Sequence, residues 1–308
     1  MRYALGFDGG GTKTDCVLMD ETSTVLARTR SGPSNAINVG AEASAAALAE
    51  AGLQALRSIQ KAPEDIGFVL AGISGAAEPE LRFEIQSCLQ PTFSKATISV
   101  TSDLVLSLGA TGESPSVVII AGTGSAVLGK TSKGFARAGG FGPIIGDPGS
   151  ANDIGRKAAS FCFQKFINSE KFLLTEEILK TFNCKWDQFV DLVREQPTIV
   201  FPRIFPIVSR CADAGDSSSQ SLLISAAKDL RNQVFVVVEK LNLKDESFFL
   251  AKTGGVFEAS GLLSAEFDGL IREMAPNVRI GPLPRGVAEA AAEIARQAMC
   301  SPFPLEES

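Results

Sequence analysis

Residues 3–14 (YALGFDGGGTKT) carry the groups best suited to binding an anion. A short apolar strand ends at Asp8, and Gly9, Gly10 and Gly11 follow it directly. Because glycine has no Cβ, the backbone N–H groups of such a turn can approach one anion closely. The glycine run therefore predicts a loop that binds phosphate groups.

The side chains around these glycines suit the same chemistry. Thr12 and Thr14 offer hydroxyl donors and Lys13 offers a positive charge. The Asp8 carboxylate can hold Mg²⁺ through water. The segment is neither GxxxxGK[ST] nor a GxGxxG that opens a helix, so both of those nucleotide motifs are excluded.

A second segment repeats the arrangement. Residues 116–121 (SVVIIA) form another apolar strand, followed by Gly122, Thr123, Gly124 and Ser125 and then by a return strand. One glycine-rich turn alone fits an ordinary β-hairpin as well as a phosphate site. Two copies favour two related halves, each offering one loop to the same polyphosphate.

Three motifs together resemble a known family. DGGGTKT at 8–14, AGTGSA at 121–126 and GGFGPIIGDPGS at 139–150 are similar to the sugar-kinase branch of the actin/hexokinase/Hsp70 ATPases. Within it they resemble the BadF/BadG/BcrA/BcrD ATPases and the N-acetylglucosamine kinases. The resemblance implies an α/β, two-domain actin-like ATPase (ribonuclease H-like) fold. It also implies mixed sheets with helices on both faces, a helical insertion in the second domain, and ATP with Mg²⁺ bound between the domains.

Asp103 is the candidate catalytic base. It follows Thr101 and Ser102 at the end of a predicted strand, where an open α/β sheet presents reactive groups. Phosphoryl transfer needs a carboxylate that accepts the proton of the attacking hydroxyl. The residues alone fit a helix N-cap equally well. The resemblance implies the catalytic role, with the 6-hydroxyl of a sugar as the group that loses its proton.

The resemblance also assigns a sugar site. Asp147 and the stretch Gly140, Phe141 and Gly142 would contact sugar hydroxyls, as would Asn35. The alternative for Asp147 is a helix N-cap before Pro148, and for Asn35 an ordinary turn.

Further nucleotide contacts follow from the same resemblance. Thr123 and Ser125 would face the β- and γ-phosphates, opposite Thr12 and Ser74. Gly254 and Gly255 would approach adenosine, although a plain strand-to-helix turn explains this pair equally well.

Three departures fall in the sugar-facing loop. Relatives usually carry Trp at Phe141 and Glu at Pro148, and often a polar or aromatic residue at Pro143. The identity of the sugar therefore stays open among N-acetylglucosamine, glucosamine, N-acetylmannosamine and other hexoses.

The secondary structure that positions these residues is read from hydrophobic periodicity. We expect a first domain over 1–112 and a second over 113–308, joined near 109–115. In the first domain strands are predicted at 3–8, 15–20, 25–31, 68–71 and 97–100, with helices at 42–61 and 79–89. In the second, strands are predicted at 117–121, 126–130, 135–138 and 248–251. The segment 150–240 is predicted to be helical and 285–299 to be a closing amphipathic helix.

Composition excludes several classes. The 308 residues carry a net charge of −6 without a basic run, which argues against nucleic acid or an anionic membrane as partner. The chain has no histidine, so proton chemistry near neutral pH requires a carboxylate. Six scattered cysteines and an N-terminus that enters a strand directly predict free thiols in the cytoplasm. The expected partners are a small sugar and a second copy of the chain.

The predicted function is ATP-dependent phosphorylation of N-acetylglucosamine or a related hexosamine at its 6-hydroxyl. The alternative is a BadF-type ATPase that activates another enzyme through an iron–sulfur cluster. No cysteine pair lies near the second loop, which counts against that alternative. No helix-turn-helix precedes Tyr3, so a DNA-binding repressor is not expected.

Overall fold

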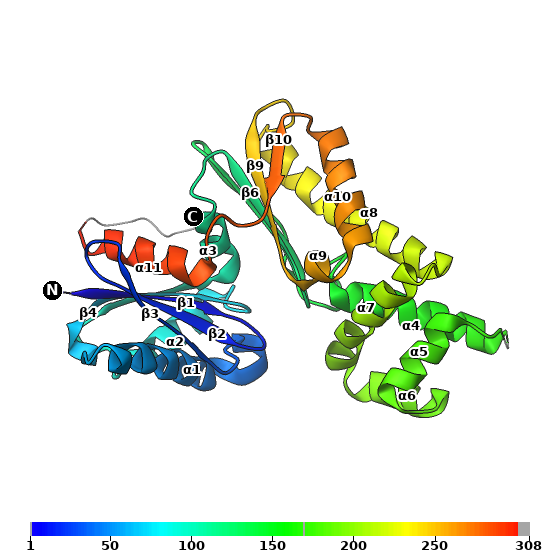
Figure 1. The fold of residues 1–308 in the computed structure, drawn as a ribbon, viewed down its shortest axis with the longest axis horizontal. Coiled ribbons are helices and arrows are strands. Elements are labelled where there is room, and N and C mark those ends of the chain that lie inside the picture. Colours follow the sequence, from blue (N-terminus) through cyan, green and yellow to red (C-terminus); the bar gives the residue numbers. More distant parts are fainter. Residues whose placement is uncertain (1, 169, 301–308) are drawn as a thin grey trace. The chain divides into compact units, whose positions relative to one another are not determined.

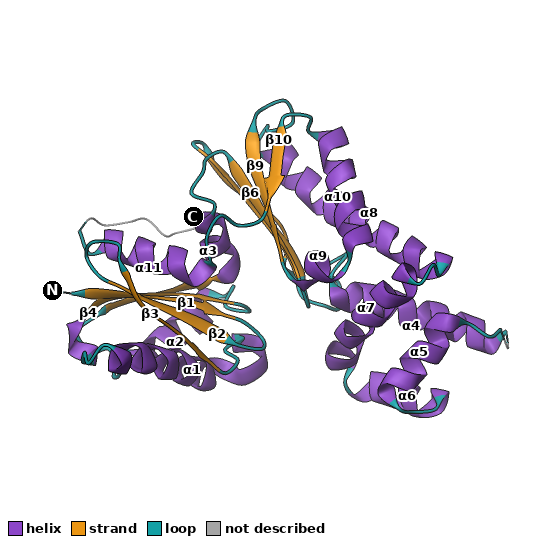
Figure 2. Ribbon diagram, in the orientation of Figure 1, coloured by secondary structure: helices purple, strands orange, loops and turns teal. Residues whose placement is uncertain are grey.

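The computed structural model describes residues 2–168 and 170–300 (Figure 1). The chain divides into two compact units. Unit 1 consists of the described residues up to Glu113 together with those from Leu283 onward, and unit 2 runs from Ser114 to Pro282. Each unit contains one five-stranded sheet with helices packed on it (Figure 2). Among the described residues, no helix is both long and apolar enough to cross a membrane.

The sheet of unit 1 has the strand order β3-β2-β1-β4-β5. Its first three strands form an antiparallel meander, and β4 and β5 run parallel to β1. The strands are β1 (Tyr3–Gly9), β2 (Thr14–Met19), β3 (Val25–Ser31), β4 (Ile66–Ile73) and β5 (Thr97–Ser102). The helices are α1 (Ala36–Ser58), η1 (Pro63–Asp65), α2 (Pro79–Leu89), α3 (Asp103–Ala110) and α11 (Val287–Ala298).

Alternation along β1 separates the two faces of this sheet. Leu5 and Phe7 pack into the core formed with α1 and α2. Ala4 packs on the opposite face with Leu106 of α3 and Ala291 of α11. Helices therefore cover both faces.

The placement of α11 differs from the sequence prediction, which assigned residues 113–308 to one domain. This helix packs on β1 and β4 of unit 1. Small residues make the contact possible: a methyl group on Gly6 would overlap the backbone of Ala288 and Ala292. The prediction followed chain order, and hydrophobic periodicity does not reveal which sheet an amphipathic helix covers.

The sheet of unit 2 repeats the connectivity of unit 1, with the order β10-β9-β6-β7-β8. Again an antiparallel meander comes first and two strands parallel to its first strand follow. The strands are β6 (Ser116–Ala121), β7 (Ser125–Thr131), β8 (Gly134–Gly139), β9 (Phe248–Thr253) and β10 (Val278–Gly281). The expectation of two related halves is confirmed.

Between β8 and β9 the described residues form five helices, which confirms the predicted helical insertion. They are α4 (Ala151–Ile167), α5 (Leu173–Phe182), α6 (Trp186–Glu195), α7 (Pro197–Asp213) and α8 (Ser217–Lys240). After β9 come α9 (Gly255–Ala259) and α10 (Gly261–Met274), which the sequence analysis did not predict. The core of the unit joins the inner face of β6 and β7 to α4, α7, α8 and α10.

Candidate functional site

The candidate residues of unit 1 gather where its parallel strands end. In the strand register Asp8 lies beside Gly72, and Gly72 lies beside Thr101. The loop after β1, the turn after β4 and the start of α3 therefore share the carboxyl edge of the sheet. This edge is the usual ligand site of open α/β sheets.

Asp8 and Asp103 are near enough to interact electrostatically. The pKa of Asp8 is raised to about 6, chiefly by burial and to a smaller extent by the negative charges of Asp103 and Asp15. The positive charge of Lys13 opposes the shift. A cation near Asp8 would stabilise its ionised form, so a carboxyl of this kind suits a metal-linked site.

Asp103 is the first residue of α3, but it does not cap the helix. The cap is Ser102, whose Oγ accepts a hydrogen bond from the Val105 N–H at 3.4 Å. The Asp103 carboxylate accepts from the Leu104 N–H at 2.9 Å. The N-cap role that the sequence left open for Asp103 thus belongs to Ser102.

Backbone hydrogen bonds join three loops of unit 1. The Gly10 N–H donates to the Lys13 carbonyl at 2.9 Å, which closes the glycine turn. The Gly10 carbonyl accepts from the N–H groups of Ser34 and Asn35, and the Gly9 carbonyl accepts from Ser74. The structure therefore brings the glycine loop, Asn35 and Ser74 together.

Several side chains of this group already have partners within the chain. Asn35 caps α1, since its Oδ1 accepts from the N–H groups of Ile37 and Asn38, while its Nδ2 donates to Ser74 Oγ. This cap starts a short helical turn at Ala36. The backbone leaves helical geometry at Gly40, where φ is 82°, so the long part of α1 begins next to the predicted residue 42. The bonding that the structure shows for Asn35 is that of a cap.

Thr14 and Lys13 are also engaged. The Thr14 hydroxyl is buried and bonds to the Gly32 carbonyl and Ser34 Oγ. The Lys13 ammonium forms an ion pair with Asp15 at 2.7 Å. Thr12, by contrast, is exposed at the turn. The Thr12 side chain is thus accessible to a ligand.

The glycine loop of unit 2 is held by the start of α4. The N–H groups of Ala151 and Asn152 donate to the carbonyls of Gly122 and Thr123. The Gly122 N–H donates to the Gly124 carbonyl at 2.9 Å. The first N–H groups of α4 therefore hold the loop by its carbonyl groups.

Asp147 lies against this loop. A methyl group on Gly124 would come within 2.5 Å of Asp147 Oδ2. Burial raises the pKa of Asp147, and the N–H groups of Gly142, Gly140 and Phe141 oppose the shift. Its Oδ1 nevertheless has no hydrogen-bond partner within residues 2–168 and 170–300.

Asp147 is not a helix cap either. The cap of α4 is Ser150, whose Oγ accepts from the Asp153 N–H at 3.2 Å. The backbone of Asp147 is left-handed, with φ of 55°, a conformation that is uncommon outside glycine and is tolerated best by Asn and Asp.

Gly254, the first glycine of the pair after β9, lies against the end of β6, next to the second glycine loop. Gly254 has φ of 107°, and a methyl group there would overlap the backbone of Ala121, at the end of β6. Packing alone therefore accounts for Gly254. A methyl group on Gly122 or Gly255 would meet no atom within 4 Å, so the fold does not require glycine at either position.

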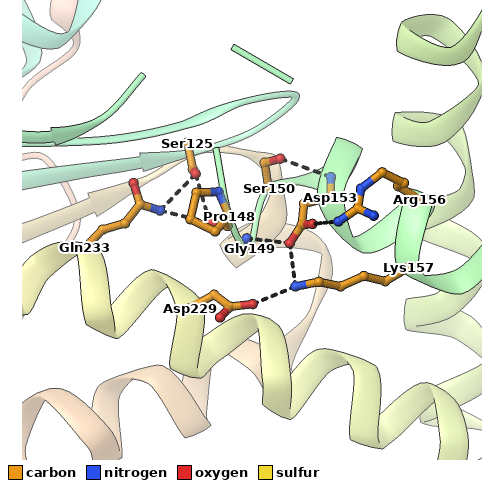
Figure 3. A network of polar contacts seen from close by, with 9 residues as sticks. All are labelled: Ser125, Pro148, Gly149, Ser150, Asp153, Arg156, Lys157, Asp229 and Gln233. Atoms are coloured by element: carbon orange, nitrogen blue, oxygen red, sulfur yellow. Dashed lines mark hydrogen bonds and ion pairs between the residues drawn. The ribbon is translucent and has the colours of Figure 1, made fainter. Parts of the chain in front are cut away.

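Ser125 is placed differently from the expectation that its hydroxyl faces phosphates. Its Oγ is buried, donates to the Pro148 carbonyl at 2.9 Å and accepts from Gln233 Nε2 at 3.0 Å. Figure 3 shows this contact and the ion pairs beside it. Four members of that network were missed by sequence reasoning because they lie on helices without a motif: Asp153, Lys157, Asp229 and Gln233.

The sugar-facing loop also exposes a run of large apolar side chains. Phe141, Ile144 and Ile145 are 75%, 87% and 91% exposed. Their loop also supplies the N–H groups that surround Asp147. An apolar surface thus adjoins a buried carboxylate, a combination that suits a ligand with both hydroxyl groups and apolar faces.

The chain is similar to a known family and to several characterised proteins. Residues 5–165 match the BadF/BadG/BcrA/BcrD ATPase family. An N-acetyl-D-glucosamine kinase of Dictyostelium discoideum is 31% identical, over 90% of this chain and 92% of that protein. An N-acetylmuramic acid/N-acetylglucosamine kinase of Clostridium acetobutylicum is 29% identical, over 96% of this chain and 99% of that protein.

A solved structure shares the fold. It is that of a Chromobacterium violaceum protein assigned to the N-acetylglucosamine kinases, with a TM-score of 0.78 and 22% identity over 96% of this chain and 99% of that one.

Proposed function

This chain belongs to the BadF/BadG/BcrA/BcrD ATPase family, and from this premise we propose that it is an ATP-dependent amino-sugar kinase. The reaction transfers the γ-phosphate of ATP to the 6-hydroxyl of N-acetylglucosamine or a related hexosamine. The two relatives named above, matched over nearly their whole lengths, support this choice of substrate.

The observation that carries the proposal is the pairing of Asp8 with Asp103 at the carboxyl edge of the first sheet. Asp103 would accept the proton of the sugar hydroxyl as it attacks phosphorus. Asp8 would hold Mg²⁺ through a water molecule, and the ion would neutralise charge on the phosphate oxygens. Burial and the negative charge of Asp103 make an isolated Asp8 carboxylate unfavourable. A cation at Asp8 would remove this penalty, as the proposed Mg²⁺ role requires.

ATP would be bound mainly by backbone groups. We assign its phosphates to N–H groups of the two glycine loops, at Gly11 in the first and at Thr123 and Gly124 in the second. The N–H groups of Gly10 and Gly122 close the two turns, so for these glycines we propose that they shape the loops around the phosphates. Thr12 and Thr123 would add hydroxyl groups and Ser74 a third. Gly255 would lie at adenosine, since a side chain there has open space around it. For Thr14 and Ser125, whose hydroxyls are engaged inside the chain, we propose a supporting role.

The sugar would be bound by Asp147 and the loop from Gly140 to Gly142. The unpartnered Asp147 Oδ1 can accept from a sugar hydroxyl, and an apolar face of the ring can pack on Phe141. A buried acceptor left unpaired costs about 1–3 kcal/mol, which a matching hydroxyl group recovers.

The proposal is tested by ADP release from the purified chain with MgATP. The panel comprises N-acetylglucosamine, glucosamine, N-acetylmannosamine, N-acetylmuramic acid, glucose and a control without sugar. We expect ADP formation well above the control with at least one amino sugar, and a product phosphorylated at O6. ADP release that no sugar accelerates would contradict the kinase proposal.

The alternative activator function makes a different prediction. Anaerobically purified protein would then contain iron and sulfide in stoichiometric amounts. We expect none, because no cysteine lies in either glycine loop.

We also place the activity in the cytoplasm and expect a homodimer, which light scattering would test.

A further inference from the structure

One peptide bond of the sugar-facing loop is held from both sides. The Pro148 carbonyl accepts hydrogen bonds from Gln233 Nε2 at 2.8 Å and from Ser125 Oγ at 2.9 Å. The Gly149 N–H, on the other side of the same peptide, donates to Asp153 Oδ2 at 3.0 Å. Figure 3 shows Gln233 and Asp153 approaching this turn from α8 and α4. Both polar groups of the Pro148–Gly149 peptide, one residue beyond Asp147, are therefore fixed.

Helix α8 is the common support of these contacts. Lys157 forms ion pairs with Asp153 and with Asp229 of α8, each at 2.7 Å. Asp229 and Gln233 are four residues apart, so they lie on the same face of α8. The turn itself rests on that face, since a methyl group on Gly149 would come within 2.6 Å of Leu230 Cγ.

Gln233 also joins two loops to each other. The same Nε2 that reaches Pro148 donates to Ser125 Oγ at 3.0 Å, at the end of the second glycine loop. Asp147 directly precedes Pro148 and lies against Gly124 of the second glycine loop. The left-handed backbone of Asp147 persists only where the surroundings hold it. Gln233 is placed to supply that restraint.

Gln233 is a costly residue at its position if it serves only packing. Its side chain is 6% exposed, and its Oε1 has no hydrogen-bond partner among the described residues. A methyl group on Gly139 would overlap this Oε1. An apolar side chain of similar length would avoid the unpaired oxygen. The cost is understandable if the Nε2 donor is needed to place the loops.

We propose that Gln233 is a positioning residue for sugar binding. It ties the second glycine loop to the Pro148–Gly149 peptide and so sets the place of the Asp147 carboxylate beside that loop. The inference rests on the proposed function, in which Asp147 binds sugar hydroxyls. Gln233 itself touches neither substrate.

The test is Gln233→Met, which keeps the length of the side chain and removes its donors. Pro148 then retains only the Ser125 bond, and the turn that carries Asp147 gains freedom. Displacement of a binding group by about 1 Å can cost up to about a hundredfold in activity. We expect the KM for the sugar to rise about tenfold or more, with the KM for ATP changed less than about twofold.

Gln220→Met is the matched control. Gln220 is also on α8, and its Nε2 donates to the Ala212 carbonyl at 3.1 Å, outside both loops. Gln220→Met also loses a hydrogen bond from a glutamine amide to a backbone carbonyl. We expect its KM values for the sugar and for ATP to stay as in the wild type. If Gln233→Met raises the sugar KM no more than Gln220→Met does, Gln233 is merely structural and the inference is wrong.

Hydrogen exchange separates this inference from the proposed function. In ligand-free protein, Gln233→Met should speed exchange of the Gly149 N–H at least tenfold, whereas Gln220→Met should not. Unchanged exchange at Gly149 would overturn the inference even in an active kinase. A wild type that turns over no amino sugar would instead refute the proposed function. If Gln233→Met does not fold, Gln233→Leu, which removes the same donors with a shorter side chain, gives the same readouts.

Discussion

At the scale of single residues, Asp8 is the group whose ionisation is most closely linked to the site. Burial raises its pKa from 3.8 to about 6, so the folded chain keeps a proton between these pH values that the unfolded chain has lost. The free energy of unfolding therefore falls as pH rises from about 4 to about 6 and levels off above that.

We predict that Asp8→Asn stabilises the metal-free protein at pH 7. The difference between 3.8 and about 6 corresponds to at most about 3 kcal/mol. Asparagine cannot ionise, so urea titrations at pH 4 and 7 should show this gain at pH 7 only. Asp245→Asn, at an exposed position, is the control and should change neither value. Equal free energies of unfolding for Asp8→Asn and the wild type at pH 7 would show that ionisation of Asp8 does not destabilise the folded chain.

Asp147 yields a prediction that concerns the sugar alone. Asp147→Asn keeps the shape of the side chain but removes the charge. Hydrogen bonds to a charged group contribute about 1.5–3 kcal/mol, so the sugar KM should rise by about tenfold to a hundredfold. The KM for ATP, measured in the same assay, is the internal control. A sugar KM within twofold of the wild type would remove Asp147 from the binding site.

At the scale of elements, the contact of α11 with β1 depends on Gly6. Gly6→Ala places a methyl group into the backbone of α11, so the helix has to shift. Such overpacking typically costs about 1–3 kcal/mol, and we expect the upper end because backbone atoms are the obstacle. Chemical denaturation measures the loss.

Gly269→Ala provides the matched control for this prediction. Gly269 lies within α10, is exposed, and has no atom within 4 Å of an added methyl group. Alanine favours a helix over glycine by about 1 kcal/mol, so this variant should be more stable than the wild type. Destabilisation of both variants to the same extent would show that the contact with α11 is not the cause.

Local sequence predicted the elements of the meanders well. Apolar strands followed directly by glycine gave both loops, and the periodic segment after Ser150 gave the helical insertion. The sequence was less informative about which residue caps each helix. The sequence left Asp103 and Asp147 open as helix N-caps, but the caps are Ser102, one residue before Asp103, and Ser150, three residues after Asp147.

Contacts across long sequence separations could not be predicted. Gln233 bonds to a loop residue 108 positions earlier, and α11 packs on the first strand of the chain. Neither contact leaves a local pattern, since a buried glutamine and an alanine-rich face occur in many helices. The fold and the loops follow from local chemistry, whereas the support beneath them follows from tertiary packing.

At the scale of the whole molecule, the repeated sheet topology accounts for two glycine loops in one chain. If both bind ATP, the nucleotide should stabilise the whole chain. At a ligand concentration of about 100 times Kd, binding adds about 2.7 kcal/mol to the free energy of unfolding. We expect MgATP to raise Tm by a few degrees and ATP with EDTA to raise it less. An equal rise with EDTA would contradict a role for Mg²⁺.

The central claim is that Asp103 accepts the proton of a sugar hydroxyl during phosphoryl transfer. The measurement that tests it most directly compares sugar-dependent ADP formation by the wild type and Asp103→Asn, with ATP affinity measured by calorimetry on both. General-base catalysis contributes about 10²–10⁴-fold, so we predict a loss of that size with ATP affinity nearly unchanged. Turnover by Asp103→Asn near the wild-type rate would contradict the account.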